Sequence, residues 1–310
     1  MKIIFMGTPE FSAPILQSLI DKYEVVLVIT QPDKVVGRKK EIVFSPVKET
    51  ALKNNIEVFQ PVNIKEDVDY VNSFNADLLV TAAYGQIIPT AILHHPNHKS
   101  INVHASLLPK LRGGAPIHKS IIEGHEKTGV TIMYMEKKMD SGDILAQAEL
   151  PILDTDNTTI LFEKLSVIGN DLLLETIPKL IDNKITPIKQ NDEEVTFAYN
   201  IKHEEQFINW NKTSREIFNL VRGLTLNPGA LTNYNNNLIK IKEVKIAEDN
   251  SNANPGTIID LNKKILIKTT DGAIEIKELQ LSGKKMMDSK SFLNGSKLLE
   301  LNTSFSNEIL

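Results

Sequence analysis

The stretch KIIFMGTPEFSAPILQSLIDKY, residues 2–23, changes its pattern once, at Gly7. Its first six residues are rich in β-branched and aromatic side chains, which predicts a buried strand that ends at Gly7. The residues that follow carry apolar side chains at helical spacing, at Ile15, Leu16, Leu19 and Ile20. A strand that turns directly into a helix is the repeating unit of α/β domains, so this stretch sets the expected fold class.

The same alternation of strand and helix continues outward from this stretch. Four more apolar runs are predicted as strands: VVLVIT (25–30), IEVFQP (56–61), ADLLVTAAYG (76–85) and SINVHAS (100–106). Between them, residues 45–55 are predicted as a helix with Ser45 as its N-cap and Pro46 in its first turn. Nearly continuous apolar runs are typical of strands covered on both faces. The sequence therefore predicts an α/β fold with a doubly wound, mostly parallel, Rossmann-like sheet.

The second half of the chain has a different organisation. Strand-like runs at 128–135 and 142–152 precede an amphipathic helix over 158–183, and the polar stretch 185–206 resembles a linker. Beyond it, one helix is followed by short alternating strands, with the turn dipeptide Asp271-Gly272 between two of them. This pattern predicts a small antiparallel β-barrel or sheet, the class that includes OB-like barrels. The predicted boundaries are 1–189 for the N-terminal domain, 190–206 for the linker and 207–310 for the C-terminal domain.

Composition limits the class of protein. The 310 residues include no cysteine, which excludes disulfides and thiolate metal sites and fits a reducing compartment. No apolar stretch approaches the roughly 20 residues that span a bilayer. Gly7, Pro9 and Glu10 interrupt the first apolar run too early for the core of a signal peptide. We therefore expect a cytoplasmic protein with no membrane partner.

Charge is unevenly distributed along the chain. The net charge is −4, yet residues 206–310 hold 14 basic and 11 acidic side chains, a net of +3. A mildly basic C-terminal third suits a polyanionic partner. A scatter of solvated lysines explains the same numbers about as well.

Polar residues near the end of the predicted strand 100–106 form half of a candidate site. Asn102 and His104 are two residues apart and therefore share one face of the strand. Ligands of open parallel sheets bind beyond the carboxyl ends of the strands. A second polar cluster follows a later strand, and one of its carboxylates, Asp140 or Asp143, could fold back on His104 and fix its tautomer.

Each of these residues also has an ordinary structural explanation. A single histidine on an apolar strand is more often structural, Asn102 could cap a turn, and acidic loop residues often bond their own backbone. The cluster His94-His95-Pro96-Asn97-His98 invites a metal site but lacks carboxylates and two-turn spacing, so we do not expect a metal there.

A series of motifs in a fixed order resembles one family. They are GTPEFSAPIL (7–16), QPDK (31–34), GRKK (37–40), SPVK (45–48), FQP (59–61), AAYGQIIP (82–89), INVHASLLPKLRGGAPI (101–117), TGVTIM (128–133), MDSGDIL (139–145), INW (208–210), NPGA (227–230), PGTI (255–258) and GKK (283–285). Over nearly its whole length, the chain resembles the methionyl-tRNA formyltransferase family.

The resemblance implies transfer of the formyl group of 10-formyltetrahydrofolate to the α-amino group of methionyl-initiator tRNA, giving N-formylmethionyl-tRNA for translation initiation. It places the catalytic trio on Asn102, His104 and Asp140, with no metal. Its folate contacts fall on Tyr84, Gly85, Ser106, Leu107, Leu108, Pro109 and Asp143. Its tRNA contacts fall on a loop at about 33–44, on the linker and on the C-terminal barrel, with Arg38, Lys39, Lys40 and Lys202 as the matching cations. We expect a monomer.

The chemistry of this reaction suits the trio. When an amine attacks the formyl carbon, negative charge grows on the formyl oxygen and the N10 leaving nitrogen must gain a proton. Asn102 would donate a neutral N–H to the oxyanion. His104 would either hold the oxyanion as an imidazolium or move the proton, and Asp140 would orient the ring.

Other interpretations predict different features. An amino-sugar N-formyltransferase would share the donor and the trio, but the loop at 33–44 and the full C-terminal domain argue against it. A dinucleotide-binding oxidoreductase would need G-x-G-x-x-G where this chain has Gly7-Thr8-Pro9. A nucleic-acid-binding module without catalysis would leave the trio unexplained. Departures from the family bear on tRNA contacts. Asn200 and His203 stand where lysines are common in the linker, and the family's tryptophan-containing NPWP-like turn reads LNPGA here.

Overall fold

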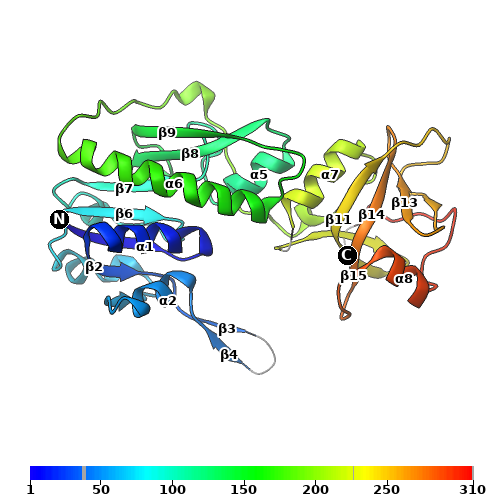
Figure 1. Cartoon of the computed structure of the whole chain (residues 1–310), viewed down its shortest axis with the longest axis horizontal. Coiled ribbons are helices and arrows are strands. Elements are labelled where there is room, and N and C mark those ends of the chain that lie inside the picture. The colour runs from blue at the N-terminus through cyan, green and yellow to red at the C-terminus, as the bar shows by residue number, and fades with distance from the viewer. Residues whose placement is uncertain (37–39, 226, 309–310) are drawn as a thin grey trace. The chain divides into compact units, whose positions relative to one another are not determined.

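The structure is a computed structural model that describes residues 1–36, 40–225 and 227–308 (Figure 1). The chain folds into two compact units, each assembled from three segments. Unit 1 comprises Met1–Pro116, Lys127–Pro151 and Phe162–Tyr199. Unit 2 comprises Ile117–Glu126, Ile152–Leu161 and Asn200–Leu310.

Unit 1 is built on a seven-stranded sheet with the order β5-β2-β1-β6-β7-β8-β9. The strands are β1 (Lys2–Gly7), β2 (Glu24–Ile29), β5 (Val58–Phe59), β6 (Leu78–Ala82), β7 (Ser100–His104), β8 (Lys127–Tyr134) and β9 (Ile144–Pro151). The first five in this order pair in parallel, and β8 and β9 add antiparallel pairs at one edge. The predicted mostly parallel α/β sheet is thus confirmed.

Helices cover both faces of this sheet, which explains why its strands are apolar on both sides. The helices of unit 1 are α1 (Ala13–Lys22), α2 (Pro46–Lys53), α3 (Val68–Asn72), α4 (Thr90–Leu93) and most of α6 (Thr158–Ile181), with 3-10 turns at Glu10–Ser12, Ile64–Glu66 and Asp192–Glu194. On one face, Ile4 and Met6 of β1 pack in one apolar cluster with residues of α3 and α4. On the other, Gly169 of α6 lies directly against Val103 of β7. Figure 1 shows α1 and α6 crossing the sheet on the same face.

Two local predictions for unit 1 can be compared with the structure. Ser45 caps α2 as predicted, because its side chain accepts a hydrogen bond from the Lys48 amide at 3.1 Å. The loop expected at 33–44 contains a short antiparallel ribbon of β3 (Lys34–Val36) and β4 (Glu41–Val43), which forms a sheet of its own.

Unit 2 is built on an antiparallel sheet with the order β10-β11-β14-β13-β12 and with β15 paired to β14. Its elements are α5 (Pro116–Ile122), the 3-10 turn Glu204–Gln206, α7 (Ser214–Gly223), β10 (Ala230–Tyr234), β11 (Asn237–Ala247), β12 (Ile258–Asp260), β13 (Ile265–Lys268), β14 (Ala273–Leu281), β15 (Met287–Asp288) and α8 (Ser289–Gly295). Asp271-Gly272 connects β13 to β14, as predicted.

A C-terminal segment, residues 302–306, lies between the two edge strands of this sheet. The Ser306 amide donates to the Asn233 carbonyl of β10 at 2.8 Å, and the Ile258 amide of β12 donates to the Thr303 carbonyl at 2.8 Å. Phe305 of this segment is buried and contacts the rings of Trp210 and Tyr234 in the core. The sheet therefore curls into a half-barrel, which confirms the predicted small antiparallel barrel. In the part of the chain that the structure describes, no helix is long and apolar enough to span a membrane.

Candidate active site

Asn102 is oriented by a residue on the neighbouring strand. Thr81 of β6 lies opposite Asn102 of β7 in the parallel register, and its hydroxyl donates to Asn102 Oδ1 at 2.6 Å. Both side chains are buried. Because the carbonyl end of the amide is engaged, the NH2 end is the one left to donate to a ligand. The sequence contains no sign of this contact, since it depends on the register between two strands.

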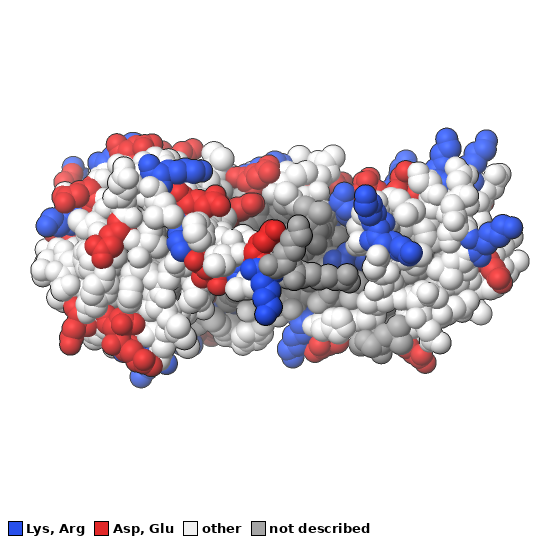
Figure 2. All heavy atoms as spheres, turned by 90° about the horizontal axis from the view of Figure 1, so that it is seen from below, with Lys and Arg blue, Asp and Glu red and all other residues white. Residues whose placement is uncertain are grey.

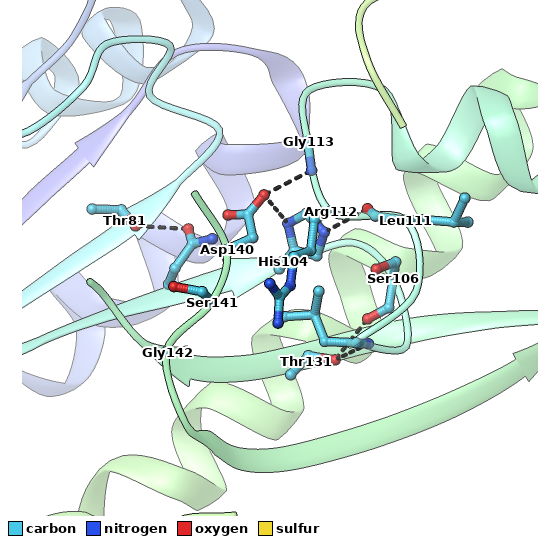
Figure 3. A network of polar contacts seen from close by, with 12 residues as sticks. Thr81, His104, Ser106, Leu111, Arg112, Gly113, Thr131, Asp140, Ser141 and Gly142 are labelled. Atoms are coloured by element: carbon cyan, nitrogen blue, oxygen red, sulfur yellow. Dashed lines mark hydrogen bonds and ion pairs between the residues drawn. The ribbon is translucent and has the colours of Figure 1, made fainter. Parts of the chain in front are cut away.

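His104 lies between two acceptors (Figure 3). Its Nε2 is 3.1 Å from the carbonyl oxygen of Leu111, which can only accept, so Nε2 carries a hydrogen. Its Nδ1 is 3.8 Å from Asp140 Oδ2. The ring itself is 6% exposed. The structure therefore brings together His104 and Asp140, which are 36 residues apart in sequence. Of the two candidate carboxylates, Asp140 and not Asp143 lies beside the ring.

Asp140 is held by the backbone of the loop that follows β7. Its Oδ2 accepts a hydrogen bond from the Gly113 amide at 2.8 Å, as Figure 3 shows. Gly113 has a φ of +127°, and a Cβ there would come within 2.6 Å of the Ala198 carbonyl oxygen, so no other residue fits. Asp140 itself adopts a φ of +50°. Asp is one of the few residues with a side chain that adopt this conformation readily.

A glutamine from the predicted linker holds the loop that carries Asp140. Gln190 Nε2 donates to the carbonyls of Asp140 at 2.9 Å and Gly142 at 2.7 Å. Its Oε1 accepts from Arg112 Nε at 3.0 Å and Nη2 at 2.7 Å. Both side chains are buried, and a buried guanidinium needs such partners. We call this pair the Arg112–Gln190 clamp. Sequence reasoning missed Gln190, because one polar residue in a polar segment gives no signal.

Gly142 is required by close packing beside the clamp. A Cβ at this position would lie 1.9 Å from the Tyr134 carbonyl oxygen. The next residue, Asp143, is half-buried, and its carbonyl accepts from the Tyr134 amide at 3.0 Å. Burial, with a smaller contribution from the charge of Asp143, raises the pKa of Tyr134.

The predicted folate-contacting run Ser106–Pro109 forms the first part of the loop after β7. Thr131 of β8 ties it down, because its hydroxyl donates to the Ser106 carbonyl at 2.7 Å and accepts from the Leu108 amide at 3.1 Å (Figure 3). Leu107 and Pro109 are half-buried. Leu108 packs in a small apolar cluster with Met133 and Ile144, against which Met135 also packs. The run is thus hydrogen-bonded to β8 and packs one apolar side chain into the protein.

The loop with Tyr84 and Gly85 follows β6. The Tyr84 carbonyl accepts from Thr8 Oγ1 at 3.0 Å and from Gln31 Nε2 at 3.1 Å, which ties this loop to those after β1 and β2. The Tyr84 ring is buried, and burial raises the pKa of its hydroxyl, with the charge of Asp67 adding to the effect. Gly85 has a φ of +96°, which favours glycine.

The predicted tRNA-contacting cations fall in three places. Arg38 and Lys39 lie outside the described residues. Lys40 is exposed just before β4, with a φ of +52°. Lys202 of unit 2 is exposed, and its Nζ is 3.9 Å from Glu204 Oε1. On the face of unit 2 that Figure 2 shows, lysine and arginine side chains are prominent.

The structure also bears on the histidine cluster at 94–98. Within residues 1–36, 40–225 and 227–308, no group of three or more His, Cys, Asp or Glu side chains is arranged to hold a metal ion.

Comparisons with known proteins show the family of the chain. Residues 1–177 match the family model described as "Formyl transferase", and residues 200–297 match "Formyl transferase, C-terminal domain". A methionyl-tRNA formyltransferase of Geobacillus sp. (strain WCH70) is 51% identical over 301 residues, covering 96% of this chain and 95% of that protein. The methionyl-tRNA formyltransferase of Bacillus cytotoxicus is 51% identical over 306 residues, with 96% of each protein covered.

Solved structures share the fold at much lower identity. An N-formyltransferase from Helicobacter canadensis, in complex with folinic acid and dTDP-3-aminofucose, superposes with a TM-score of 0.69 at 20% identity, covering 89% of this chain and 98% of its own. HypX from Aquifex aeolicus superposes with a TM-score of 0.67 at 17% identity, covering 95% of this chain and 47% of its own. These likenesses concern the fold alone.

The chain belongs to the methionyl-tRNA formyltransferase family, because the family model spans more than half of the chain and the named relatives are half identical along nearly all of it.

Proposed function

We propose that the protein transfers the formyl group of 10-formyltetrahydrofolate to the α-amino group of methionine esterified to initiator tRNA. One observation carries this proposal: the ring of His104, at the end of β7, lies 3.8 Å from the carboxylate of Asp140, and Asn102 lies two residues before His104 on the same face of the strand. They do so in a chain that is half identical to relatives named methionyl-tRNA formyltransferase.

The reaction requires a donor for a developing oxyanion. The amine nitrogen attacks the formyl carbon and forms the new C–N bond while negative charge grows on the formyl oxygen. The C=O bond is then restored as the bond to N10 breaks, and the proton lost by the amine ends on N10. The NH2 end of Asn102 is free to donate because Thr81 occupies its Oδ1. A preorganised donor of this kind contributes ~2.7–4 kcal/mol to transition-state stabilisation.

His104 and Asp140 form the electrostatic part of the proposed site. Both ring nitrogens face acceptors, Leu111 O at 3.1 Å and Asp140 Oδ2 at 3.8 Å. A ring that shuttles a proton must leave one of these neighbours, whereas a ring that stays in place keeps both. The arrangement therefore favours His104 as a fixed group beside the oxyanion, with Asp140 as its orienting partner.

The donor would bind against the two tied loops next to the trio. The buried apolar cluster of Leu108, Met133 and Ile144 would support, from beneath, the loop against which the planar ring system of the donor binds. Tyr84, Gly85, Asp143 and the run from Ser106 to Pro109 supply the polar and backbone groups around it. This fit supports a folate co-substrate, and the proposed chemistry needs no metal.

The proposed tRNA contacts begin at the loop 33–44 and continue over the linker at 190–206 and the C-terminal domain at 207–310. Arg38, Lys39, Lys40 and Lys202 are the proposed cations, in a cytoplasmic monomer. We expect Arg38→Ala to lower kcat/KM for methionyl-tRNA and to reduce the slope of log affinity against log salt by about one. A change confined to the KM for the folate donor would contradict this assignment.

A sugar substrate is the alternative, because a structural relative was solved with a sugar nucleotide. The deciding experiment supplies 10-formyltetrahydrofolate with either methionyl-tRNA or an amino-sugar nucleotide and measures formylation of each acceptor. Our proposal expects only methionyl-tRNA to react, and an Asn102→Ala variant serves as the control for background transfer. Formylation of the sugar alone would overturn the proposal.

A further inference from the structure

Two aromatic side chains at the end of unit 1 are unusually exposed and lie parallel. Phe197 is 43% exposed and Tyr199 is 60% exposed. Their ring planes differ by 2° and their centroids are 5.4 Å apart. Other exposed aromatic rings have polar partners within the protein: Lys48 lies over Phe44, and Tyr70 donates to Glu57. We call Phe197 and Tyr199 the aromatic pair.

The backbone beneath the aromatic pair is rigidly paired. The Arg112 amide donates to the Thr196 carbonyl at 2.9 Å, the Ala198 amide to the Arg112 carbonyl at 2.8 Å, and the Ala115 amide to the Ala198 carbonyl at 2.9 Å. Ala198 is fully buried. Because side chains alternate along an extended chain, burial of Ala198 leaves its two neighbours to project outward.

The segment that pairs with residues 196–198 is the loop after β7, which also organises the proposed active site. The carbonyl of Leu111 holds His104, and the amide of Gly113 holds Asp140. The Leu111 amide in turn donates to Thr196 Oγ1 at 2.9 Å, one residue before Phe197. The aromatic pair therefore lies on a segment that is hydrogen-bonded to the backbone that positions the two ionisable members of the trio.

We infer that the aromatic pair is a stacking platform for an unpaired nucleobase near the 3′ end of the tRNA substrate. The inference rests on the proposed function, because an aminoacyl group on the 3′-terminal ribose brings single-stranded bases with it when its amine reaches His104. Unstacked bases are commonly bound on aromatic rings, and two parallel, stacked rings that are both exposed leave an outer ring face on which a base can continue the stack. Stacking acts on any base and depends little on salt, so it complements the cationic contacts proposed elsewhere.

Kinetics of alanine variants test the platform. Tyr199→Ala and Phe197→Ala should each lower kcat/KM for methionyl-tRNA by ~5- to 150-fold, the range that corresponds to loss of one base–aromatic stack. The loss should fall on KM for tRNA and leave KM for the folate donor unchanged. Tyr199→Phe should behave like the wild type. Ile188→Ala, which alters a side chain of the same segment that is 63% exposed but not aromatic, is the matched control and should have no effect.

A binding measurement separates this inference from the proposed function. The chain has one tryptophan, Trp210, which is fully buried, so a Tyr199→Trp variant adds an exposed reporter. Intact uncharged tRNA should quench its emission, and tRNA shortened by its unpaired 3′ nucleotides should not. Equal quenching by both RNAs would overturn the inference that the aromatic pair stacks on a base. Unchanged kcat/KM in both alanine variants, in an enzyme that formylates methionyl-tRNA, would also overturn it. Failure of the wild type to formylate methionyl-tRNA would instead remove the proposed function, while the titration still decides about stacking.

Discussion

The contact between Thr81 and Asn102 decides which end of the Asn102 amide is available for chemistry. Thr81→Val removes the hydroxyl that donates to Asn102 Oδ1 but keeps the shape of the side chain. We expect kcat to fall by up to about 100-fold, with little change in either KM, since losing a whole oxyanion donor costs ~10²–10³-fold. Thr81→Ser keeps the hydroxyl and should retain most activity in the same steady-state assay. Wild-type kcat in the valine variant would refute the role of this contact.

The His104–Asp140 pair can be tested as a unit. Asp140→Asn keeps an oxygen that can accept from the Gly113 amide but removes the charge 3.8 Å from His104 Nδ1. We expect Asp140→Asn and His104→Ala each to lower kcat by about 10²-fold or more, with tRNA affinity nearly unchanged. Because residues that act together are non-additive, the double variant should be no slower than the slower single variant. Full activity in either single variant would exclude that residue from the mechanism.

At the scale of elements, the Arg112–Gln190 clamp joins the segment after α6 to the loop that carries Asp140. Gln190→Ala should remove two bonds to that loop and leave the Arg112 guanidinium, which is 1% exposed, without its main acceptor. We expect a loss of about 1–3 kcal/mol in the free energy of unfolding, measured with urea, and a lower kcat under conditions where the variant is fully folded.

The control for the clamp lies on the same segment. Asp192 pairs with Arg112 at 3.9 Å, but its side chain is 74% exposed. Asp192→Asn should therefore change the free energy of unfolding by less than about 0.5 kcal/mol and leave kcat unaltered. If Gln190→Ala and Asp192→Asn changed the free energy of unfolding and kcat equally, the buried hydrogen bonds of Gln190 would not be the cause of the loss.

The elements also show which parts of the fold could be predicted from sequence. The strand ending at Gly7 and the helix capped by Ser45 follow from periodicity and local capping, so their positions were predictable. Asn102 and His104 were predictable as a pair because they share a strand face. Thr81 and Gln190 were not, since their roles depend on strand register and on the path of a segment without periodic pattern.

At the scale of the whole molecule, the half-barrel of unit 2 depends on the segment 302–306 between β10 and β12. Removing residues 302–310 would expose the edges of both strands and delete Phe305, which is 3% exposed, from the core. Loss of a buried phenylalanine alone costs about 3–5 kcal/mol, so we expect a marked fall in stability, observed as earlier unfolding of the Trp210 signal in denaturant. A chain that ends after Asn307 keeps these contacts and should unfold like the wild type.

The division of the chain bears on how this protein could be recombined with its relatives. Unit 2 includes the stretches Ile117–Glu126 and Ile152–Leu161 as well as everything after residue 199. Thr158 donates to the Gly223 carbonyl at 2.5 Å, and Arg215 donates to Asp154 at 2.6 Å, so the second of these stretches is hydrogen-bonded to α7. In a chimera made with a single crossover near residue 200, the stretches 117–126 and 152–161 would come from one parent and α7 from the other. A functional graft of the second unit must therefore take all three pieces of chain from the same parent.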